Sequence, residues 1–422
     1  MIKPGQFTVG ETFVGAGGTH VGFKEAGFKT LFVNDINKDC IKTLLFNNPE
    51  LKSSSIYQCS ILDLNGKKIK YDIKNKSLDV LFGGIVCKGF SLAGEKSPND
   101  ERNFFYRKQI QLVKDLKPKI SIIENVPGMK NAKVLAGETP DDLKEEINWL
   151  WKELNNLKGV KAANRKINAD NYKLDKRSNS LRKRKEQILK TLTDSGLLIS
   201  VLDDIKKRYN SIGYKVYHKV LNSAWYGAGT KRNRIIIVAI RKDLKAEYHF
   251  PHPTHYTKGV GNLPKEWNES INGLPNCKTV GECLNEIDYS NKVDVDNLPM
   301  NHNSKTVSRF KYIPEGDSIA NHIEKLPEDL KISKFYSRGN TMRLDRKNPS
   351  PTLVPGHSNF PVHPTEHRSI TVREAATISS FPLDYKFFGN HSKRCEHVGN
   401  AVPPKLGFAI AKSCINFLNK TL

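Results

Sequence analysis

The sequence has little cysteine and no long apolar run. Its seven cysteines form no CxxC pair: Cys40, Cys59, Cys87, Cys277, Cys283, Cys395 and Cys414. This scatter argues against a disulfide framework or a structural zinc site. No run approaches the roughly 18 apolar residues that a membrane helix needs, and the N-terminal segment lacks the apolar core of a signal peptide. These absences predict a cytoplasmic protein in a reducing compartment, without membrane association.

Acidic residues are scarce relative to basic ones. The 422 residues include 68 Lys and Arg against 44 Asp and Glu, a formal net charge of +24. Such an excess favours a polyanionic partner, of which nucleic acid is the commonest, although a lysine-rich solvated surface explains the charge equally well. Apolar residues make up 38% of the chain, and its length allows a large core and two domains.

The first part of the chain alternates short apolar runs with helix-like stretches. We expect strands over 7–13, 29–35, 78–84 and 119–126, and helices over 19–27, 38–48 and 107–116. This rhythm predicts an α/β fold with a doubly wound, mostly parallel sheet. Because ligands of such sheets bind beyond the carboxyl ends of the strands, the functional residues should lie there.

Two regions depart from this rhythm. In the first, Ile147, Leu150, Trp151, Leu154 and Leu157 form a helical stripe, and a second, strongly basic helical stretch follows. We expect a helical hairpin inserted into the sheet domain, whose basic face mainly keeps it in solution. Contact with DNA phosphates is the alternative. The second region, from 241 to about 340, is rich in Pro, Asn, Gly, His and Lys, and predicts a smaller, loop-rich domain.

The predicted division of the chain has five parts. A sheet domain begins with 1–130, is interrupted by the helical basic insertion 131–200, and continues through 201–240. The smaller domain occupies 241–390, and 391–422 returns to the sheet domain.

Two motifs predict a site for a nucleoside cofactor. The glycine-rich segment 13–18 stands between a strand and a helix, where a ligand can approach the backbone closely. The next strand ends in Asp35, and an acidic residue there can bond ribose hydroxyls. Since the spacing lacks the GxGxxG of dinucleotide sites, S-adenosylmethionine is a better candidate than NAD.

A cysteine follows another predicted strand. Cys87 stands on a glycine-flanked loop, and the adjacent Lys88 would favour its thiolate. Taken alone, a buried and inert thiol is the commoner interpretation.

Charged groups mark two more strand ends. Glu124 closes an apolar strand, where burial should raise its pKa, as proton donation to a ring nitrogen requires. An ion-paired or helix-capping Glu124 is the alternative. Arg232 and Arg234 precede a buried strand at alternate positions, which suits a phosphate or a base oxygen, although solubility would also explain them.

The ordered set of motifs resembles the DNA (cytosine-5) methyltransferases of bacterial restriction-modification systems. The set comprises the glycine loop, the Cys87 loop, Glu-Asn-Val at 124–126, the paired arginines, TVREAA with FP at 371–382, and GNAVPP at 399–404. The resemblance covers about the first 130 residues and most of 200–240 and 341–415. It implies a Rossmann-like methyltransferase fold, S-adenosylmethionine as cofactor and a flipped cytosine in duplex DNA as substrate. It also implies a cognate restriction endonuclease acting on the same site and a monomer on DNA.

The resemblance also assigns residues. The cofactor would contact Phe13, Gly15, Ala16, Gly17, Gly18, Asp35, Ile61, Phe104, Asn400 and Ala401. Cys87 corresponds to the nucleophile, Glu124 to the residue that holds the base edge, and Arg234 to a base-contacting arginine with Arg232 as its partner. The region 241–390 would be the target recognition domain, with the base-reading side chains between 241 and 340.

Several positions depart from the family pattern. Ile85-Val86-Cys87-Lys88 stands where Pro-Pro-Cys-Gln is common, which removes a rigid turn. Thr230 replaces a usual Gln, and Ser60 a frequent acidic residue. Two alternatives follow: a transfer RNA cytosine-5 methyltransferase on the same scaffold, and a catalytically silent DNA-binding regulator. A nicotinamide oxidoreductase is weaker, because the glycine spacing does not fit it.

Overall fold

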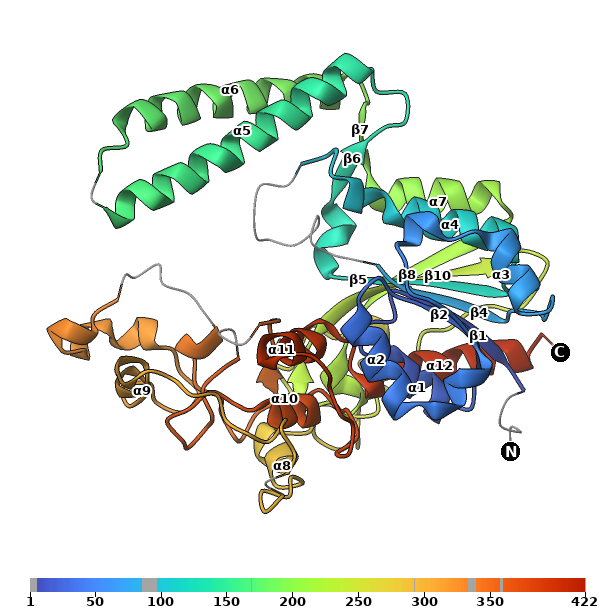
Figure 1. Ribbon diagram of the computed structural model, residues 1–422. Coiled ribbons are helices and arrows are strands. Elements are labelled where there is room, and N and C mark those ends of the chain that lie inside the picture. Colours follow the sequence, from blue (N-terminus) through green and yellow to red (C-terminus); the bar gives the residue numbers. More distant parts are fainter. Residues whose placement is uncertain are drawn as a thin grey trace.

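A seven-stranded sheet forms the centre of the molecule (Figure 1). The computed structural model describes residues 6–85, 97–167, 169–291, 293–332, 339–356 and 360–421, so Cys87 and Lys88 lie outside the described residues. The strands are β1 (Thr8–Thr12), β2 (Lys29–Asn34), β3 (Ser55–Tyr57), β4 (Val80–Gly84), β5 (Ile120–Asn125), β8 (Tyr214–Asn222) and β10 (Asn233–Arg241).

The sheet has the order β3-β2-β1-β4-β5-β10-β8. All pairs from β3 to β5 are parallel, whereas β10 runs antiparallel to both β5 and β8. The prediction of a doubly wound, mostly parallel sheet is therefore confirmed. The segment 223–232 between β8 and β10 is shorter than the crossover of about a dozen residues or more that parallel neighbours need, which agrees with their antiparallel pairing.

Helices cover both faces of the sheet (Figure 1). One face carries α1 (Gly18–Glu25), α2 (Lys38–Asn47) and α12 (Pro404–Asn419), and the other carries α3 (Gly66–Asp72), α4 (Phe105–Leu116) and α7 (Val201–Ser211). Alternate residues of the central strands pack into two apolar cores, one on each face of the sheet. Ile122 packs in the cluster with Leu406 of α12, and its neighbour Ile123 in the cluster with Leu112 of α4. This is why the central strands read as continuous apolar runs.

The predicted helical insertion is a hairpin of two long helices. Helices α5 (Asp141–Lys166) and α6 (Tyr172–Asp194) rise from the two-stranded β6 (Lys133–Leu135) and β7 (Leu198–Ser200). Most of the predicted apolar stripe, from Ile147 to Leu154, lies between the helices and packs against Ile188 and Leu192 of α6. Within the described residues, no helix combines the length and apolar character that crossing a bilayer requires.

The region after β10 has few long elements. It contains α8 (Val280–Leu284), α9 (Ser304–Phe310), α10 (Val372–Ile378) and α11 (His391–Asn400). Its short strand β11 (Ser350–Pro351) pairs in parallel with β9 (Thr230–Lys231), which comes just before β10. The 3-10 helices are Pro49–Ser53, Ile61–Asp63, Glu101–Phe104, Pro127–Asn131, Ser223–Tyr226, Lys265–Trp267, Ile319–Lys325, Glu328–Leu330 and Gly339–Thr341.

The beginning of the region predicted as a separate domain packs on the sheet. Tyr248, Phe250 and Trp267 share a buried cluster with Ile236 of β10. Further along, a different cluster forms around Phe310, together with residues near 313–330 and 362. The loop-rich part thus has a core of its own, and the domain boundaries stay a prediction.

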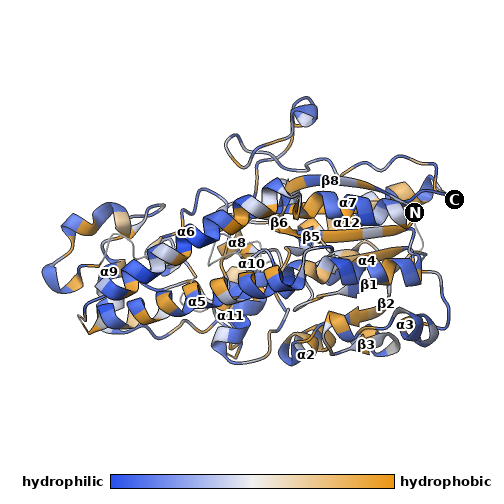
Figure 2. Ribbon diagram, turned by 90° about the horizontal axis from the view of Figure 1, so that it is seen from above, coloured by the Kyte–Doolittle hydropathy of each residue, from blue (hydrophilic) through white to orange (hydrophobic). Residues whose placement is uncertain are grey.

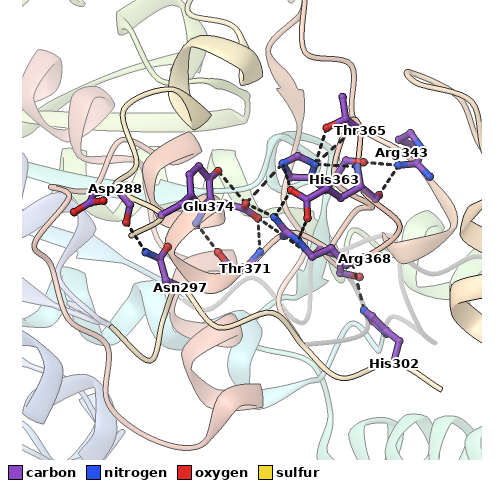
Figure 3. A network of polar contacts seen from close by, with 12 residues as sticks. Asp288, Asn297, His302, Arg343, His363, Thr365, Arg368, Thr371 and Glu374 are labelled. Atoms are coloured by element: carbon purple, nitrogen blue, oxygen red, sulfur yellow. Dashed lines mark hydrogen bonds and ion pairs between the residues drawn. The ribbon is translucent and has the colours of Figure 1, made fainter. Parts of the chain in front are cut away.

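A buried polar network fixes α10 to the loop-rich region (Figure 3). The Glu374 carboxylate is fully buried and accepts two hydrogen bonds of 2.8 Å from the Arg368 guanidinium and one of 3.0 Å from the Tyr289 hydroxyl. It also accepts a bond from the backbone N–H of Thr371, whose hydroxyl accepts one from the Glu374 N–H, so the two residues form a capping box. The TVREAA segment therefore begins α10 and fixes its first turn to the loop-rich region.

A second buried pair ties the glycine loop to the sheet. The His20 Nδ1 atom of α1 donates to the Glu11 carboxylate of β1 across 2.7 Å, and both side chains are almost completely buried. Burial alone would lower the pKa of His20, but the Glu11 carboxylate raises it to about 9. The imidazolium is therefore the form present at neutral pH, and the pair closes the two ends of the loop 13–18.

This pair makes stability depend on pH above neutrality. Because the pKa of His20 is higher in the folded chain than its usual 6.5, its contribution is complete below about pH 6.5 and disappears as the pH rises through 9. A shift of this size corresponds to about 3 kcal/mol. We expect His20→Asn, which keeps a nitrogen donor but does not titrate, to remove this part of the pH dependence in denaturant unfolding between pH 6.5 and 9.5. The exposed His252→Asn is the control, and parallel profiles for all three proteins would contradict the assignment.

Candidate active site

The carboxyl ends of five strands open into one cavity of about 360 Å³. From β1 the chain winds outward through β2 and β3, then returns to the other side of β1 with β4 and β5, so the crevice lies where the winding reverses. The lining residues come mainly from the carboxyl ends of β1 to β5 and the segments after them, from the starts of α4 and β10, and from the end of α11. The sheet topology thus gathers motifs that are almost 400 residues apart.

The glycine loop forms one wall of this cavity. Phe13 has a φ of 53° and Gly15 a φ of 57°, in the left-handed region that a bulky side chain such as phenylalanine rarely adopts. A Cβ added at Gly15 would meet nothing within 4 Å, so its backbone faces open space. The strained loop therefore exposes peptide groups to a ligand in the cavity.

The acidic residue at the end of β2 faces the same loop. The Asp35 carboxylate accepts a bond of 2.8 Å from the Gly15 N–H and another of 2.8 Å from the Asn37 N–H. Burial raises the pKa of Asp35, while these N–H groups lower it. Next to it, Ile36 lines the cavity with its side chain 70% exposed. An acceptor beside an uncovered apolar surface fits a ribose with an attached base.

An aromatic wall completes this end of the cavity. Phe105, at the start of α4, lines the cavity and stacks on Phe13 with ring centroids 5.9 Å apart. Phe104, the residue that the sequence favoured, is not among the lining residues; its ring lies under the Arg107 guanidinium at 4.4 Å. The sequence offers two adjacent phenylalanines, and only the direction in which α4 begins separates them.

At the other end, a buried ion pair lies between β5 and β10. The Glu124 carboxylate and the Arg234 guanidinium are 2.7 Å apart and both side chains are less than a tenth exposed. In the antiparallel register Glu124 lies opposite Ile236. Arg234 comes two residues before Ile236, so its side chain lies on the same face of the sheet as that of Glu124. Burial raises the pKa of Glu124 above its ordinary value, opposed by Arg234 and Arg232.

The next residue holds the start of the cysteine loop. The Asn125 side-chain amide donates a hydrogen bond of 3.1 Å to the backbone carbonyl of Ile85, the last described residue before the loop. Both residues are buried and line the cavity. From the Glu-Asn-Val motif, the sequence analysis assigned a role to Glu124 and none to Asn125. The position of Asn125 within that motif was the only sign of its role. The predicted nucleophile Cys87 lies outside the described residues.

Arg232 has a different kind of contact from Arg234. Its guanidinium donates to the backbone carbonyls of Leu353, at 3.2 Å, and of Asn400, at 3.1 Å. It therefore ties β10 to the C-terminal end of α11, where Asn400 and Ala401 line the cavity. The close approach of the glycine loop to this segment excludes a side chain at Gly18, since a Cβ there would lie 2.1 Å from the Val402 carbonyl.

One lining residue has unused hydrogen-bonding groups. His397 of α11 is 4% exposed, and within the described part of the chain neither ring nitrogen has a hydrogen-bond partner. Burial lowers its pKa, so the ring is neutral and can both donate and accept. Buried polar atoms of this kind are normally satisfied, which indicates that the cavity takes a polar ligand.

Most of the predicted site comes together. The cavity is lined by Phe13, Gly15, Ala16, Gly18, Asp35, Ile61, Glu124, Arg232, Arg234, Asn400 and Ala401. Gly17 lies in the loop without lining the cavity, and Phe105 lines it in place of Phe104. Ser60, which departs from the family pattern, is also a lining residue.

The sequence model for C-5 cytosine-specific DNA methylases matches residues 7–148 and 189–416. The chain belongs to this family. The methylase is 26% identical to the type II methyltransferase M.Eco47II of Escherichia coli over 428 residues, which cover 99% of this chain and 81% of that protein. It is also 26% identical to M.PspPI of Psychrobacter sp. over 431 residues, with the same coverage.

A solved structure has the same fold. The methylase matches a DNA modification methyltransferase encoded within an E. coli prophage with a TM-score of 0.55 and 22% identity, covering 98% of this chain and all of that one. The family match and the type II relatives make the protein a DNA cytosine-5 methyltransferase of the restriction-modification type. The family and fold imply use of S-adenosylmethionine, and the cavity between Asp35 and Glu124 has suitable groups for it.

We predict that Arg232 acts on the cofactor through Asn400. Arg232→Lys keeps the charge but cannot reach both the Leu353 and Asn400 carbonyls. We expect the dissociation constant of S-adenosylmethionine, measured by calorimetry without DNA, to rise on the order of tenfold, as for the loss of a charge-assisted bond. Arg241→Lys, at the far end of the same strand, should bind normally. Equal affinity of the Arg232→Lys variant and the wild type would refute this role.

Proposed function

We propose that this methylase transfers the methyl group of S-adenosylmethionine to carbon 5 of a cytosine flipped out of duplex DNA, through a transient bond to Cys87. The observation that carries the proposal is the Glu124–Arg234 pair in the same cavity as the Asp35 and Phe105 wall. One end of the cavity has a titratable acid and a cation, and the other end has groups that can bind a nucleoside. This arrangement suits a reaction between a nucleic-acid base and a nucleoside cofactor.

The cofactor would lie along the glycine loop. The Asp35 carboxylate would accept hydrogen bonds from the ribose hydroxyls, and Phe105 and Ile36 would enclose the adenine. His397 and Asn400 are placed to contact its polar end. When bound, S-adenosylmethionine supplies an electrophilic methyl group on a positively charged sulfur.

The nucleophile would come from the loop that starts at Ile85. Cys87 follows Ile85, a residue that lines the cavity, by two positions in the sequence. Addition of the thiolate to carbon 6 forms a carbon–sulfur bond and makes carbon 5 nucleophilic. After carbon 5 accepts the methyl group, loss of its proton and cleavage of the carbon–sulfur bond restore the base and free Cys87.

Glu124 would hold the base edge. Burial raises the pKa of its carboxyl, so it can share a proton with ring nitrogen 3 as the thiolate adds. Arg234 fixes the carboxylate and offers its remaining donors to the base oxygen. A stacked base cannot reach this cavity, which is why the cytosine must be flipped.

We further propose duplex DNA as the substrate, read by side chains of 241–340, and protection of host DNA from a cognate endonuclease, with one molecule acting on each site. The family match and the type II relatives support DNA over transfer RNA. Labelled methyl incorporation into DNA and transfer RNA tests this choice, and bisulfite sequencing of DNA from an expressing host gives the recognition sequence. Incorporation only into transfer RNA would overturn it.

The covalent step predicts trapping. A duplex with 5-fluorocytosine at the target should form a denaturation-resistant adduct with the wild type and cofactor, because fluorine cannot leave as a proton does. Cys87→Ala and Cys87→Ser should form none and should lose methyl transfer, while binding DNA nearly as the wild type does. Full turnover by either variant would rule out the covalent route.

The role of Glu124 predicts a selective loss of rate. Glu124→Gln keeps the size of the side chain but not its titration, and we expect kcat to fall by about 10² to 10⁴. Cofactor affinity should change little, because Glu124 lies at the opposite end of the cavity from Asp35. The exposed Glu145→Gln in α5 is the control. A kcat within twofold of the wild type would exclude Glu124 from the chemistry.

A further inference from the structure

The hairpin of α5 and α6 is not explained by the family. The family model stops at 148 and resumes at 189, so it omits most of both helices. Each helix is long, with α5 spanning roughly 40 Å. The methylase thus carries a large projecting element that lies mostly outside the family model.

Charge is unevenly distributed along this hairpin. The distal half, 155–185, has eleven basic and two acidic residues, a formal charge of +9, and the rest of the two helices has three basic and seven acidic residues, a formal charge of −4. The distal basic residues are Lys158, Lys161, Arg165, Lys166, Lys173, Lys176, Arg177, Arg182, Lys183, Arg184 and Lys185. Solubility requires charge of either sign, so it does not account for this segregation.

Part of this charge is used within the hairpin, and part is not. Arg177 pairs with Glu153 and Arg184 with Glu146, which fastens α6 to α5. By contrast Lys173, Lys176 and Lys183 are exposed and have no ion-pair partner among the described residues. Their spacing of three and seven residues places them on one side of α6.

The hairpin extends over the loop-rich region. Figure 1 shows it projecting from the sheet domain on the same side as α8 to α11, and in Figure 2, seen from above, α5 and α6 lie in front of part of that region. Figure 2 also shows α6 as largely hydrophilic. A duplex held by the loop-rich region would therefore have the basic half of the hairpin on its other side.

We propose that the distal half of the hairpin, 155–185, is a sequence-independent binding surface for the DNA backbone. Long lysine side chains on a straight helix can each neutralise a phosphate without reading a base. The surface would add affinity for any duplex and hold the DNA while the loop-rich region selects the site. The inference requires only that the methylase acts on DNA, and does not depend on the Cys87 mechanism.

The test is the salt dependence of DNA binding. We would compare the wild type with a triple variant, Lys173→Gln, Lys176→Gln and Lys183→Gln, on a cognate and on a random duplex. Each lost phosphate contact should reduce the slope of log affinity against log salt by about 0.9, so the slope should fall by about 2 to 3. Both duplexes should be affected equally, and kcat at saturating DNA should stay that of the wild type.

The matched control removes three exposed lysines at the far end of the molecule: Lys67→Gln, Lys70→Gln and Lys76→Gln, in and after α3. It lowers the net charge equally but should keep the wild-type slope. If the hairpin variant and the control give the same slope, the charge acts only over long range, and the proposal fails. Loss of affinity for the cognate duplex alone would also overturn it, because that would indicate base reading.

Discussion

The buried carboxylate of Glu124 is the constraint on which the active site depends. A carboxylate at the end of a buried strand is costly to desolvate unless a cation accompanies it. The cation is Arg234, which reaches it only because β10 runs antiparallel beside β5 in one register. The pairing of these two strands therefore does more than extend the sheet, since it creates the charged end of the cavity.

Three further contacts hold the rest of the site to this frame. Asn125 binds the backbone at Ile85, Arg232 binds the backbone at Asn400, and the His20–Glu11 pair closes the glycine loop. In each, a buried side chain fixes the position of a peptide group or of a loop end. Fixed backbone is what a ligand site needs, because loops hold reacting groups less accurately than strands and helices do.

Local pattern predicted most of the fold, and the resemblance to the family named most of the residues that line the cavity. Apolar runs located the strands, and the helical stripe from Ile147 to Leu157 located the hairpin, because burial imposes periodicity. The pattern missed α3, α7 and α11, which are short or rich in charge. The resemblance assigned Phe104, whereas Phe105 lines the cavity. Adjacent side chains on a helix differ by about 100° in direction, so only the packing of α4 decides which one faces the cavity.

The sequence by itself determined the class of fold, the family motifs and the residue types of the site, because these follow from composition, periodicity and order along the chain. The tertiary structure alone decided that Glu124 pairs with Arg234 while Arg232 holds Asn400. It also placed the basic half of the hairpin opposite the loop-rich region (Figure 1). Contacts between segments distant in sequence depend on register, helix direction and the path of the chain in space, none of which a local pattern records.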